Sequence, residues 1–250
     1  MWLAKSEPFK IACIDESSHI ENQPLNRSPT VIIPLRSFMS GKTRLNITSP
    51  EQRRQFLGTC AQFVISSSRN YPTIILTRDA EVAQWARDQS LEVFNDIGQD
   101  LNSSLEACLA QLANTKVERV TIVLGDIPLM FPIDLSQAFD SHKAWILKDR
   151  QGVGTNMFSF DLPLRFGLSY GSNSYQNHLR SLKTHGVEYV VPSLRLAQYD
   201  VDSPDDLVEL RRLETTGCNL SAQAKKRIAT LWDIYSAGHL DQLPSTKAGR

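Results

Sequence analysis

The sequence from Val120 to Pro128 runs Val-Thr-Ile-Val-Leu-Gly-Asp-Ile-Pro, so five strand-forming residues pass directly into a glycine and a carboxylate. A strand of this composition is typical of one buried on both faces of a sheet. Gly125 allows close approach of the backbone, and Pro128 fixes the turn that follows. Ligands of open α/β sheets bind beyond the carboxyl ends of the strands, so Asp126 is a candidate functional residue; the alternative is a carboxylate that only caps a helix.

Similar apolar runs occur on both sides of this stretch, and helical patterns separate them. The runs are 30–33, 73–76, 91–94 and 144–147. The clearest helix begins at Leu101 and places Leu105, Cys108, Leu109 and Leu112 on one apolar stripe. Strand and helix alternate from residue 30 to about 145, which predicts an α/β fold with a mostly parallel central sheet and helices on both faces.

The pattern after residue 150 is more varied. We expect a strand over 157–160, a helix around 174–185, strands near 187–191 and 195–200, a helix opened by Ser203 as N-cap, and a last helix over about 220–237. The expected organisation is an N-terminal extension (1–29), one domain (30–215) and a C-terminal helical extension with a frayed end (216–250). The last helix is amphipathic, so it either packs on the core or builds a homodimer; we favour packing.

Charge and composition exclude several classes of protein. The 250 residues contain 27 Lys and Arg against 27 Asp and Glu, so no basic excess favours a nucleic-acid partner. No window approaches about 18 uncharged apolar residues, and the N-terminus lacks the apolar core of a signal peptide, which predicts no membrane span and a cytoplasmic protein. The four cysteines show no metal-type spacing and are expected to be reduced core thiols.

A basic loop follows the first predicted strand. Residues 34–45 carry Arg36, Lys42 and Arg44 among small residues. Lys and Arg neutralise phosphate oxygens, so this loop is a candidate for wrapping a polyphosphate, although a solvated basic loop has the same composition. It is not a Walker A loop, because the required glycine and lysine spacing is absent.

Acidic residues recur near the end of the predicted sheet. Asp200 and Asp202 alternate in a segment that we expect to be a strand, where both would point the same way. Together with Asp126 they would form an oxygen-only cluster able to hold one or two magnesium ions. The alternative is that Asp202 caps the next helix and Asp200 is merely solvated.

Two further segments are candidates for ligand contact. The segments 152–156 and 170–178 combine glycines, hydroxyls and a serine, Ser174, at a predicted helix start, a composition that suits an anion. His178 lies inside this group and is expected to pack or to support another residue. Asn102, at a helix N-terminus, offers a paired donor and acceptor that suit the edge of a nucleobase. Helix capping equally explains an asparagine at this position.

Taken in order, these motifs resemble the 2-phospholactate guanylyltransferase family over about residues 30–210. The segments that carry the resemblance are 33–36, 41–45, 101–102, 125–128, 154–156, 170–178 and 200–207. The resemblance implies a glycosyltransferase-A-like nucleotidyltransferase fold. It also implies that GTP and a small phosphorylated carboxylic acid react to give a guanosine diphospho-acid and pyrophosphate. In this family the product feeds assembly of the deazaflavin coenzyme F-420, where a partner transferase takes the phospho-acid.

The resemblance also assigns roles to residues. It implies magnesium ligands at Asp126, Asp200 and Asp202, with Lys42, Arg44 and Asp126 as catalytic residues. It implies acid-binding residues at Thr155, Gly171 and Ser174, and nucleotide-binding residues at Leu35, Arg36, Lys42, Arg44 and Asn102. The acids used within the family are 2-phospho-L-lactate, phosphoenolpyruvate and 3-phospho-D-glycerate.

The chain departs from the family pattern at four positions. Arg36 stands where Lys is usual, Gly41 and Gly125 where Ala is expected, and Asn173 where Gly is common beside the acid-binding serine. Asn173 therefore leaves the identity of the acid open. One alternative is a related nucleotidyltransferase that acts on a sugar phosphate or a molybdenum cofactor, but the sequence lacks the Gly-rich opening loop of those enzymes. The other alternative is a catalytically inactive nucleotide-binding module.

Overall fold

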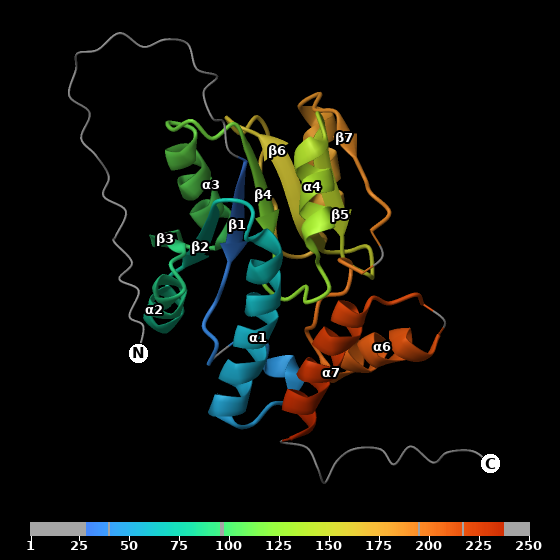
Figure 1. Cartoon of the computed structure of the whole chain (residues 1–250). Coiled ribbons are helices and arrows are strands. Elements are labelled where there is room, and N and C mark those ends of the chain that lie inside the picture. The colour runs from blue at the N-terminus through green and yellow to red at the C-terminus, as the bar shows by residue number, and fades with distance from the viewer. Residues whose placement is uncertain (1–28, 40, 96–97, 195, 217, 238–250) are drawn as a thin grey trace, which may run out of the picture.

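The computed structural model describes residues 29–39, 41–95, 98–194, 196–216 and 218–237 (Figure 1). These residues build a seven-stranded sheet in the order β3-β2-β1-β4-β6-β5-β7. The strands are β1 (Thr30–Pro34), β2 (Thr73–Thr77), β3 (Glu92–Asn95), β4 (Arg119–Val123), β5 (Ala144–Lys148), β6 (Thr155–Asp161) and β7 (Tyr189–Val190).

The sheet is mostly parallel, as predicted. β1 pairs in parallel with both β2 and β4, and β2 pairs in parallel with β3. β6 alone runs against its neighbours, because it pairs antiparallel with β4 on one side and with β5 on the other. The chain crosses from β1 to β2 on one side and reaches β4 on the other, so the strand order reverses beside β1. A reversal of this kind opens a crevice at the carboxyl ends of the strands.

Helices cover both faces of the sheet (Figure 1). The helices are α1 (Pro50–Ser68), α2 (Ala80–Asp88), α3 (Leu101–Leu112), α4 (Pro132–Asp140), α5 (Ser174–Thr184), α6 (Pro204–Thr215) and α7 (Ala222–Ser236), with a short 3-10 helix η1 (Thr43–Leu45). Alternate residues of β1 point to opposite faces: Ile33 packs with α1, α2 and α4, whereas Ile32 packs with α3 and α5. In β4 the neighbouring residues Ile122 and Val123 are buried in these two opposite clusters, which confirms the two-sided burial predicted for this strand.

A third apolar cluster joins α1, η1, α6 and α7 at the lower end of the molecule (Figure 1). Ile228, Leu231 and Tyr235 of α7 are buried in it, which confirms the predicted apolar face of the last helix. Arg227 is only 3% exposed, whereas its neighbours Lys225 and Lys226 are exposed. The C-terminal helix therefore packs on the domain, as we favoured.

The structure corrects one predicted element and shortens another. Residues 196–198 form a bend and a turn, and residues 199–200 have no regular structure, so the expected strand is absent there. The strand expected near 187–191 is reduced to the two residues of β7. The predicted extension 1–29 and the predicted frayed end lie almost entirely outside the described residues. No helix in the described ranges combines the length and the hydropathy that crossing a bilayer requires.

Candidate active site

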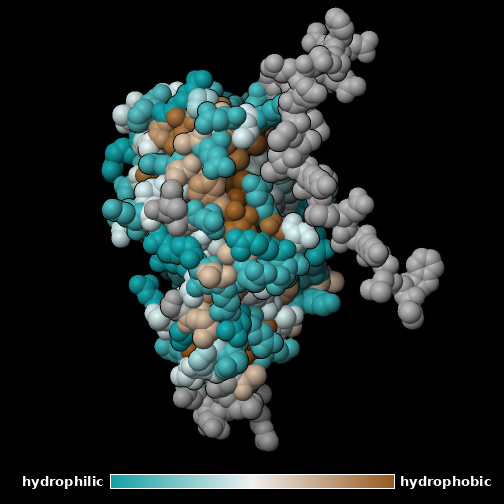
Figure 2. Space-filling model, turned by 90° about the vertical axis from the view of Figure 1, so that its left-hand side faces the viewer, coloured by the Kyte–Doolittle hydropathy of each residue, from teal (hydrophilic) through white to brown (hydrophobic). Residues whose placement is uncertain are grey.

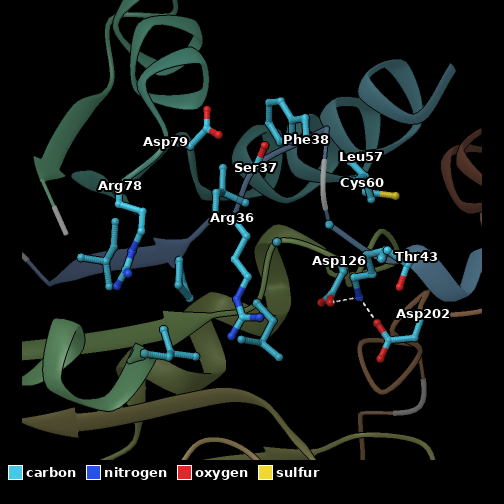
Figure 3. Close-up of a pocket in the computed structure, with 18 of the residues that line it drawn as sticks. Arg36, Ser37, Phe38, Thr43, Leu57, Cys60, Arg78, Asp79, Asp126 and Asp202 are labelled. Atoms are coloured by element: carbon cyan, nitrogen blue, oxygen red, sulfur yellow. Dashed lines mark hydrogen bonds and ion pairs between the residues drawn. The ribbon is translucent and has the colours of Figure 1, made fainter. Parts of the chain in front are cut away.

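A cavity of about 1200 Å³ opens beyond the carboxyl ends of β1, β2 and β4 (Figure 3). Its walls come from the segments that follow these strands, from Leu57 and Cys60 of α1, from the start of α3, and from two single residues, Gly171 and Asp202. This is the place that the sheet topology predicts for a ligand, next to the reversal of strand order. The basic loop and the Gly125-Asp126 pair both lie in its wall.

Lys42 forms ion pairs with two carboxylates at once, those of Asp126 and Asp202 (Figure 3). Its backbone is left-handed, with φ of 54°, which turns the chain at the start of η1 and directs the side chain to the acids. Burial opposes the charge on the ammonium group, but the Asp126 and Asp202 carboxylates outweigh it and raise the pKa of Lys42. The lysine is therefore a permanent cation that screens two like charges from each other.

Backbone contacts bring the two carboxylates together from distant parts of the chain. The Val201 N–H donates to the Asp126 carbonyl oxygen at 3.0 Å, so the segment before α6 lies against the loop after β4. Asp206 Oδ2 accepts from the N–H groups of Asp202 and Ser203 at 3.1 and 2.9 Å and fixes the start of α6. The predicted proximity of Asp126 and Asp202 is confirmed, but a capped bend produces it, and the expected strand does not.

The third predicted metal ligand, Asp200, lies close enough to interact with the other two. Burial, together with the negative charges of Asp126 and Asp202, raises the pKa of Asp200 to about 7. Asp126 Oδ1 is buried and has no hydrogen-bond partner among the described residues. An unpartnered carboxylate oxygen beside two further carboxylates suits a hard cation such as magnesium, so the donor chemistry fits. The described residues nevertheless contain no preformed group of three or more potential ligands, and Lys42 provides the countercharge.

Three arginines add positive charge to the cavity wall. Arg36 follows β1, Arg44 lies in η1, and Arg78 follows β2. Figure 3 shows the side chains of Arg36 and Arg78 extending in the same direction from neighbouring segments of the cavity wall. Arg78 Nη2 donates to the Gly98 carbonyl oxygen at 2.6 Å, which holds it beside the segment before α3. The sequence analysis did not identify Arg78. Its position directly after an apolar strand could have identified it, because Asp126 was identified from its position after a strand.

Leu35 contributes apolar surface to the cavity, and its packing explains one departure from the family pattern. The Leu35 N–H donates to the Leu76 carbonyl oxygen at 2.9 Å, which continues the β1–β2 pairing beyond the strand. A Cβ atom on Gly125 would lie only 2.2 Å from Leu35 Cδ2. Glycine at position 125 therefore leaves room for the leucine, whose side chain would have to shift beside alanine.

Asn102 lies in the first turn of α3, and its amide is engaged by the protein. Its Nδ2 donates to the Tyr170 carbonyl oxygen at 3.0 Å, and its Oδ1 accepts from the Tyr170 N–H at 2.6 Å. The paired donor and acceptor expected to meet a base edge thus meet a peptide group. In this structure Asn102 ties the loop before α5 to α3, next to the cavity.

The predicted acid-binding residues are grouped, but only Gly171 lines the cavity. Gly171 has φ of 122°, which favours glycine, and Asn173 has φ of 56°, the left-handed conformation that asparagine tolerates best after glycine. Thr155 and Ser174 are buried side by side, with their hydroxyl oxygens 3.3 Å apart. His178 is completely buried and its Nδ1 lies 3.0 Å from Thr155 Oγ1. The structure brings the three predicted residues together and adds the histidine.

The cysteines in the described ranges are free, as predicted, and Cys60 is the one that borders the cavity. Burial raises the pKa of the Cys60 thiol to about 12, with smaller and opposing contributions from Lys42 and Asp126. A thiol with such a pKa stays protonated near neutral pH. It is therefore a packing residue and not a nucleophile.

Comparison with known proteins supports the expectations drawn from the sequence. A family model described as guanylyl transferase, CofC-like, matches residues 29–217. A phosphoenolpyruvate guanylyltransferase of Thermobaculum terrenum is 25% identical over 191 residues, which cover 73% of this chain and 83% of that protein. A 2-phospho-L-lactate guanylyltransferase of Methanocaldococcus vulcanius is 25% identical over 184 residues, which cover 72% and 83% of the two chains.

Solved structures share the fold at low sequence identity. A Desulfovibrio desulfuricans protein assigned to the nucleotide-diphospho-sugar transferases aligns with a TM-score of 0.63 at 14% identity, over 84% of this chain and 97% of that one. A 4-diphosphocytidyl-2C-methyl-D-erythritol synthase aligns with a TM-score of 0.52 at 13% identity, over 76% and 99% of the two chains. The predicted nucleotidyltransferase fold is therefore confirmed.

Proposed function

This chain belongs to the family of CofC-like guanylyl transferases, and on that premise we propose that it transfers GMP from GTP to a small phosphorylated carboxylic acid and releases pyrophosphate. The observation that carries the proposal is the meeting of Lys42, Asp126 and Asp202 in the wall of one large cavity. Three carboxylates and three arginines around this lysine provide charges of both signs where a triphosphate and a second phosphate must approach each other.

The positive groups act on the nucleotide. Lys42 and Arg44 lie together at the start of η1, so their charges suit the triphosphate and the departing pyrophosphate. Arg36 and Arg78 enter the cavity from the strand ends β1 and β2 and extend the same positive field (Figure 3). Leu35 supplies an apolar surface for the nucleoside. A guanidinium group can bind a phosphate through two parallel hydrogen bonds, so these arginines suit a triphosphate.

Asp126, Asp200 and Asp202 would hold magnesium, by the donor chemistry described above. When bound, magnesium supplies positive charge that screens the two phosphate groups from each other. In the structure the Lys42 ammonium group lies between the Asp126 and Asp202 carboxylates and reduces the repulsion between these two negative charges. Removal of divalent ions with EDTA is therefore expected to stop turnover without unfolding the protein, because Lys42 already pairs with both Asp126 and Asp202.

The reaction needs positioning more than acid–base catalysis. A phosphate oxygen of the acid attacks the α-phosphorus of GTP, a new phosphorus–oxygen bond forms, and the bond to the β-phosphate oxygen breaks to release pyrophosphate. A phosphate monoester is largely dianionic at neutral pH, since its second pKa is about 6, so no general base has to remove a proton. The residues of the site align the two phosphates and stabilise the charge that moves to the leaving group.

The acid and the pathway belong to the proposal as well. Curated relatives act on phosphoenolpyruvate or 2-phospho-L-lactate, as their names state, and we add 3-phospho-D-glycerate as a third candidate. The guanosine diphospho-acid would be consumed by a transferase that passes the phospho-acid to a deazaflavin precursor, in assembly of coenzyme F-420. The family membership supports these assignments.

The test is pyrophosphate release by the purified protein with GTP and magnesium, with each of the three acids supplied separately. A coupled deazaflavin transferase and its precursor trap the labile product, and ATP replaces GTP in a parallel series. We expect release with GTP and one acid at a rate well above that with ATP. A folded protein that releases no pyrophosphate with any of the acids, but modifies a sugar phosphate or a pterin cofactor, would contradict the proposal.

A further inference from the structure

The ammonium group of Lys42 lies between two carboxylates of the cavity wall. It forms ion pairs with Asp126 Oδ2 and with Asp202 Oδ1, which belong to segments 84 and 160 residues away in the chain (Figure 3). The lysine side chain is 18% exposed and lines the cavity together with both acids. The space between these two oxygens is therefore filled by a cation that belongs to the chain itself.

The other carboxylate oxygen of Asp126 is shielded from the cavity. Oδ1 is buried, and no group among the described residues donates a hydrogen bond to it. Magnesium usually keeps several of its water molecules when it binds a protein. A hydrated ion that enters from the cavity therefore meets Asp126 at Oδ2, and Oδ1 can become a second ligand only from that position. Lys42 occupies this position.

Lys42 and a metal ion compete for the same oxygens. Magnesium binds carboxylate oxygens at about 2.0–2.1 Å, and an ammonium group donates to them at about 2.7–2.9 Å. Two cations held at one pair of oxygens would repel each other strongly at such short range. The ion pairs of Lys42 with Asp126 and Asp202 must therefore break before a metal ion can bridge the two carboxylates.

A triphosphate offers the ammonium group a second place to bind. Lys42, Arg36 and Arg44 line one cavity, and all three side chains attract phosphates. The charge of a lysine is carried at the end of a flexible stem. It can therefore move from the carboxylates to a phosphate without any change in the left-handed backbone at the start of η1. Departure of Lys42 leaves the carboxylates open to the metal ion that accompanies the nucleotide.

We propose that Lys42 is a placeholder cation, which holds Asp126 and Asp202 together in the nucleotide-free protein and yields their oxygens to a divalent metal ion only when a triphosphate binds. The nucleotide and the metal in this proposal rest on the proposed function, whereas the competition rests on the ion pairs of Lys42. The site is therefore closed to free divalent ions until the nucleotide opens it.

Binding of Mn²⁺ to the nucleotide-free protein tests the competition. Carboxylate sites that suit magnesium also suit Mn²⁺, and the loss of the EPR signal of the free ion measures how much of it is bound. We expect Lys42→Met to bind Mn²⁺ at least about tenfold more tightly than the wild type, because a positive charge in contact with both carboxylates is gone. A folded Lys42→Met protein that binds Mn²⁺ no more tightly than the wild type would overturn the proposal.

Two further variants serve as controls. Arg44→Met removes one positive charge from the same loop, but Arg44 is exposed and forms no ion pair in the described part of the chain, so the affinity should shift by about threefold or less. Lys42→Met combined with Asp126→Asn locates the ion and should lose most of the gain, because one ligand has lost its charge. Equal gains in Lys42→Met and Arg44→Met would show that only the net charge of the cavity matters, which contradicts a placeholder.

Thermal unfolding provides a second measurement and shows whether the variants fold. A ligand that binds only the folded state raises the unfolding temperature. Without nucleotide, Mn²⁺ should therefore stabilise Lys42→Met and leave the wild type almost unchanged. Lys42→Gln takes its place if Lys42→Met does not fold, because the amide can still donate a hydrogen bond to a carboxylate. Micromolar binding of Mn²⁺ to the nucleotide-free wild type that is lost in Asp126→Asn would overturn the proposal without either lysine variant.

The role of the triphosphate is tested with a GTP analogue that cannot react, α,β-methylene GTP. Equilibrium dialysis measures the Mn²⁺ held by the protein with the analogue present, after subtraction of the ion held by the analogue alone. The wild type should now bind Mn²⁺ at least as tightly as Lys42→Met, because its lysine has moved to the phosphates. A tenfold advantage of Lys42→Met that persists with the analogue bound would overturn this part of the proposal.

These measurements distinguish this proposal from the proposed function, because none of them uses the acid or requires turnover. If the wild type released pyrophosphate but Lys42→Met gained no affinity for Mn²⁺, only the placeholder role would be overturned. If the wild type released no pyrophosphate with any acid but Lys42→Met gained affinity, the proposed function would be contradicted and the competition between Lys42 and the metal ion would stand.

Discussion

At the scale of single residues, the charge balance around Lys42 governs the site. Asp126 is one of its two carboxylate partners and also carries a buried oxygen with no partner. Replacement by asparagine removes a charge from the cavity but leaves Lys42 paired with Asp202. The residue is thus expected to matter more for turnover than for folding.

We expect Asp126→Asn to lower kcat by at least about 100-fold, the range found when one preorganised electrostatic group is removed from a catalytic site. The free energy of unfolding should change by about 1 kcal/mol or less. Pyrophosphate release and denaturant unfolding measure the two effects. Asp205→Asn is the matched control, because Asp205 is exposed in α6 and outside the cavity. An Asp126→Asn variant as active as this control would remove Asp126 from the site.

The lowered pKa of His178 predicts how the free energy of unfolding depends on pH. Its pKa is about 4 in the folded protein and about 6.5 in the unfolded chain, so the unfolded state takes up the proton first as pH falls. Stability is therefore lost as pH falls below about 6.5, by about 2 kcal/mol between pH 7 and pH 5. The variant His178→Asn should lose about 2 kcal/mol less than the wild type over this interval, as measured by urea unfolding. Identical pH profiles would show that the histidine titrates normally.

At the scale of elements, α7 supports the loop that carries Asp126. Arg227 is buried, and its Nη1 donates to the carbonyl oxygens of Pro128 and Met130 at 2.8 and 2.7 Å. Nη2 donates to the hydroxyls of Ser66 and Ser67 in α1 at 3.2 and 3.0 Å. The guanidinium group thus joins α7, α1 and the loop after β4, although this helix lies outside the residues matched by the family model.

Arg227→Met should lower the free energy of unfolding by about 3 kcal/mol or more, because four hydrogen bonds from the guanidinium group to carbonyl and hydroxyl oxygens are lost. Lys226→Met is the control one residue away, since Lys226 is exposed, and it should change stability by about 0.5 kcal/mol or less. Chemical unfolding of both variants provides the comparison. Equal stability of the two would show that the buried guanidinium contributes nothing to the fold.

The sequence was sufficient to predict most helices and strands but not the contacts between them. Strand composition and the stripe of α3 predicted β1, β2, β4 and α3, because burial on a sheet is a property of local pattern. The strand predicted before α6 was wrong, since the Ser203 N–H donates to the Asp206 carboxylate and the Val201 N–H donates to the Asp126 carbonyl oxygen, and both contacts use the backbone. Such contacts leave little trace in the order of apolar residues.

The site shows the same division. Positions after strands identified Asp126 and the basic loop, but the ion pairs of Lys42 and the burial of Arg227 were not predicted. Both features depend on contacts between residues that are far apart in the chain. In the sequence, a single charged residue in a polar segment cannot be distinguished from a solvated one. The strand over 157–160 was predicted as β6, but its antiparallel direction was not, because strand direction depends on the path of the chain between elements.

At the scale of the whole molecule, the C-terminal helix completes a shared apolar cluster. Removal of α7 would expose the faces of α1 and α6 that it covers, including the fully buried Phe56. The folded domain therefore extends beyond the predicted boundary at residue 215 and includes α7.

A chain that ends at residue 217 should lose cooperative unfolding or associate through the exposed apolar surface. Circular dichroism during heating and light scattering at room temperature measure these two outcomes. A chain that ends at residue 237 keeps α7 and serves as the control for truncation. A monomeric and cooperatively folded 1–217 chain would show that α7 is an accessory helix.

The clamp formed by Arg227 also has a consequence for the order of events during synthesis. The arginine lies 99 residues after Pro128, whose carbonyl oxygen it binds. A ribosome that adds about 5–20 residues per second makes the loop of Asp126 about 5–20 s before the residue that holds it in place. The nascent chain thus carries the loop of Asp126 without its final support until α7 has been made, and we expect competence for turnover only after that point.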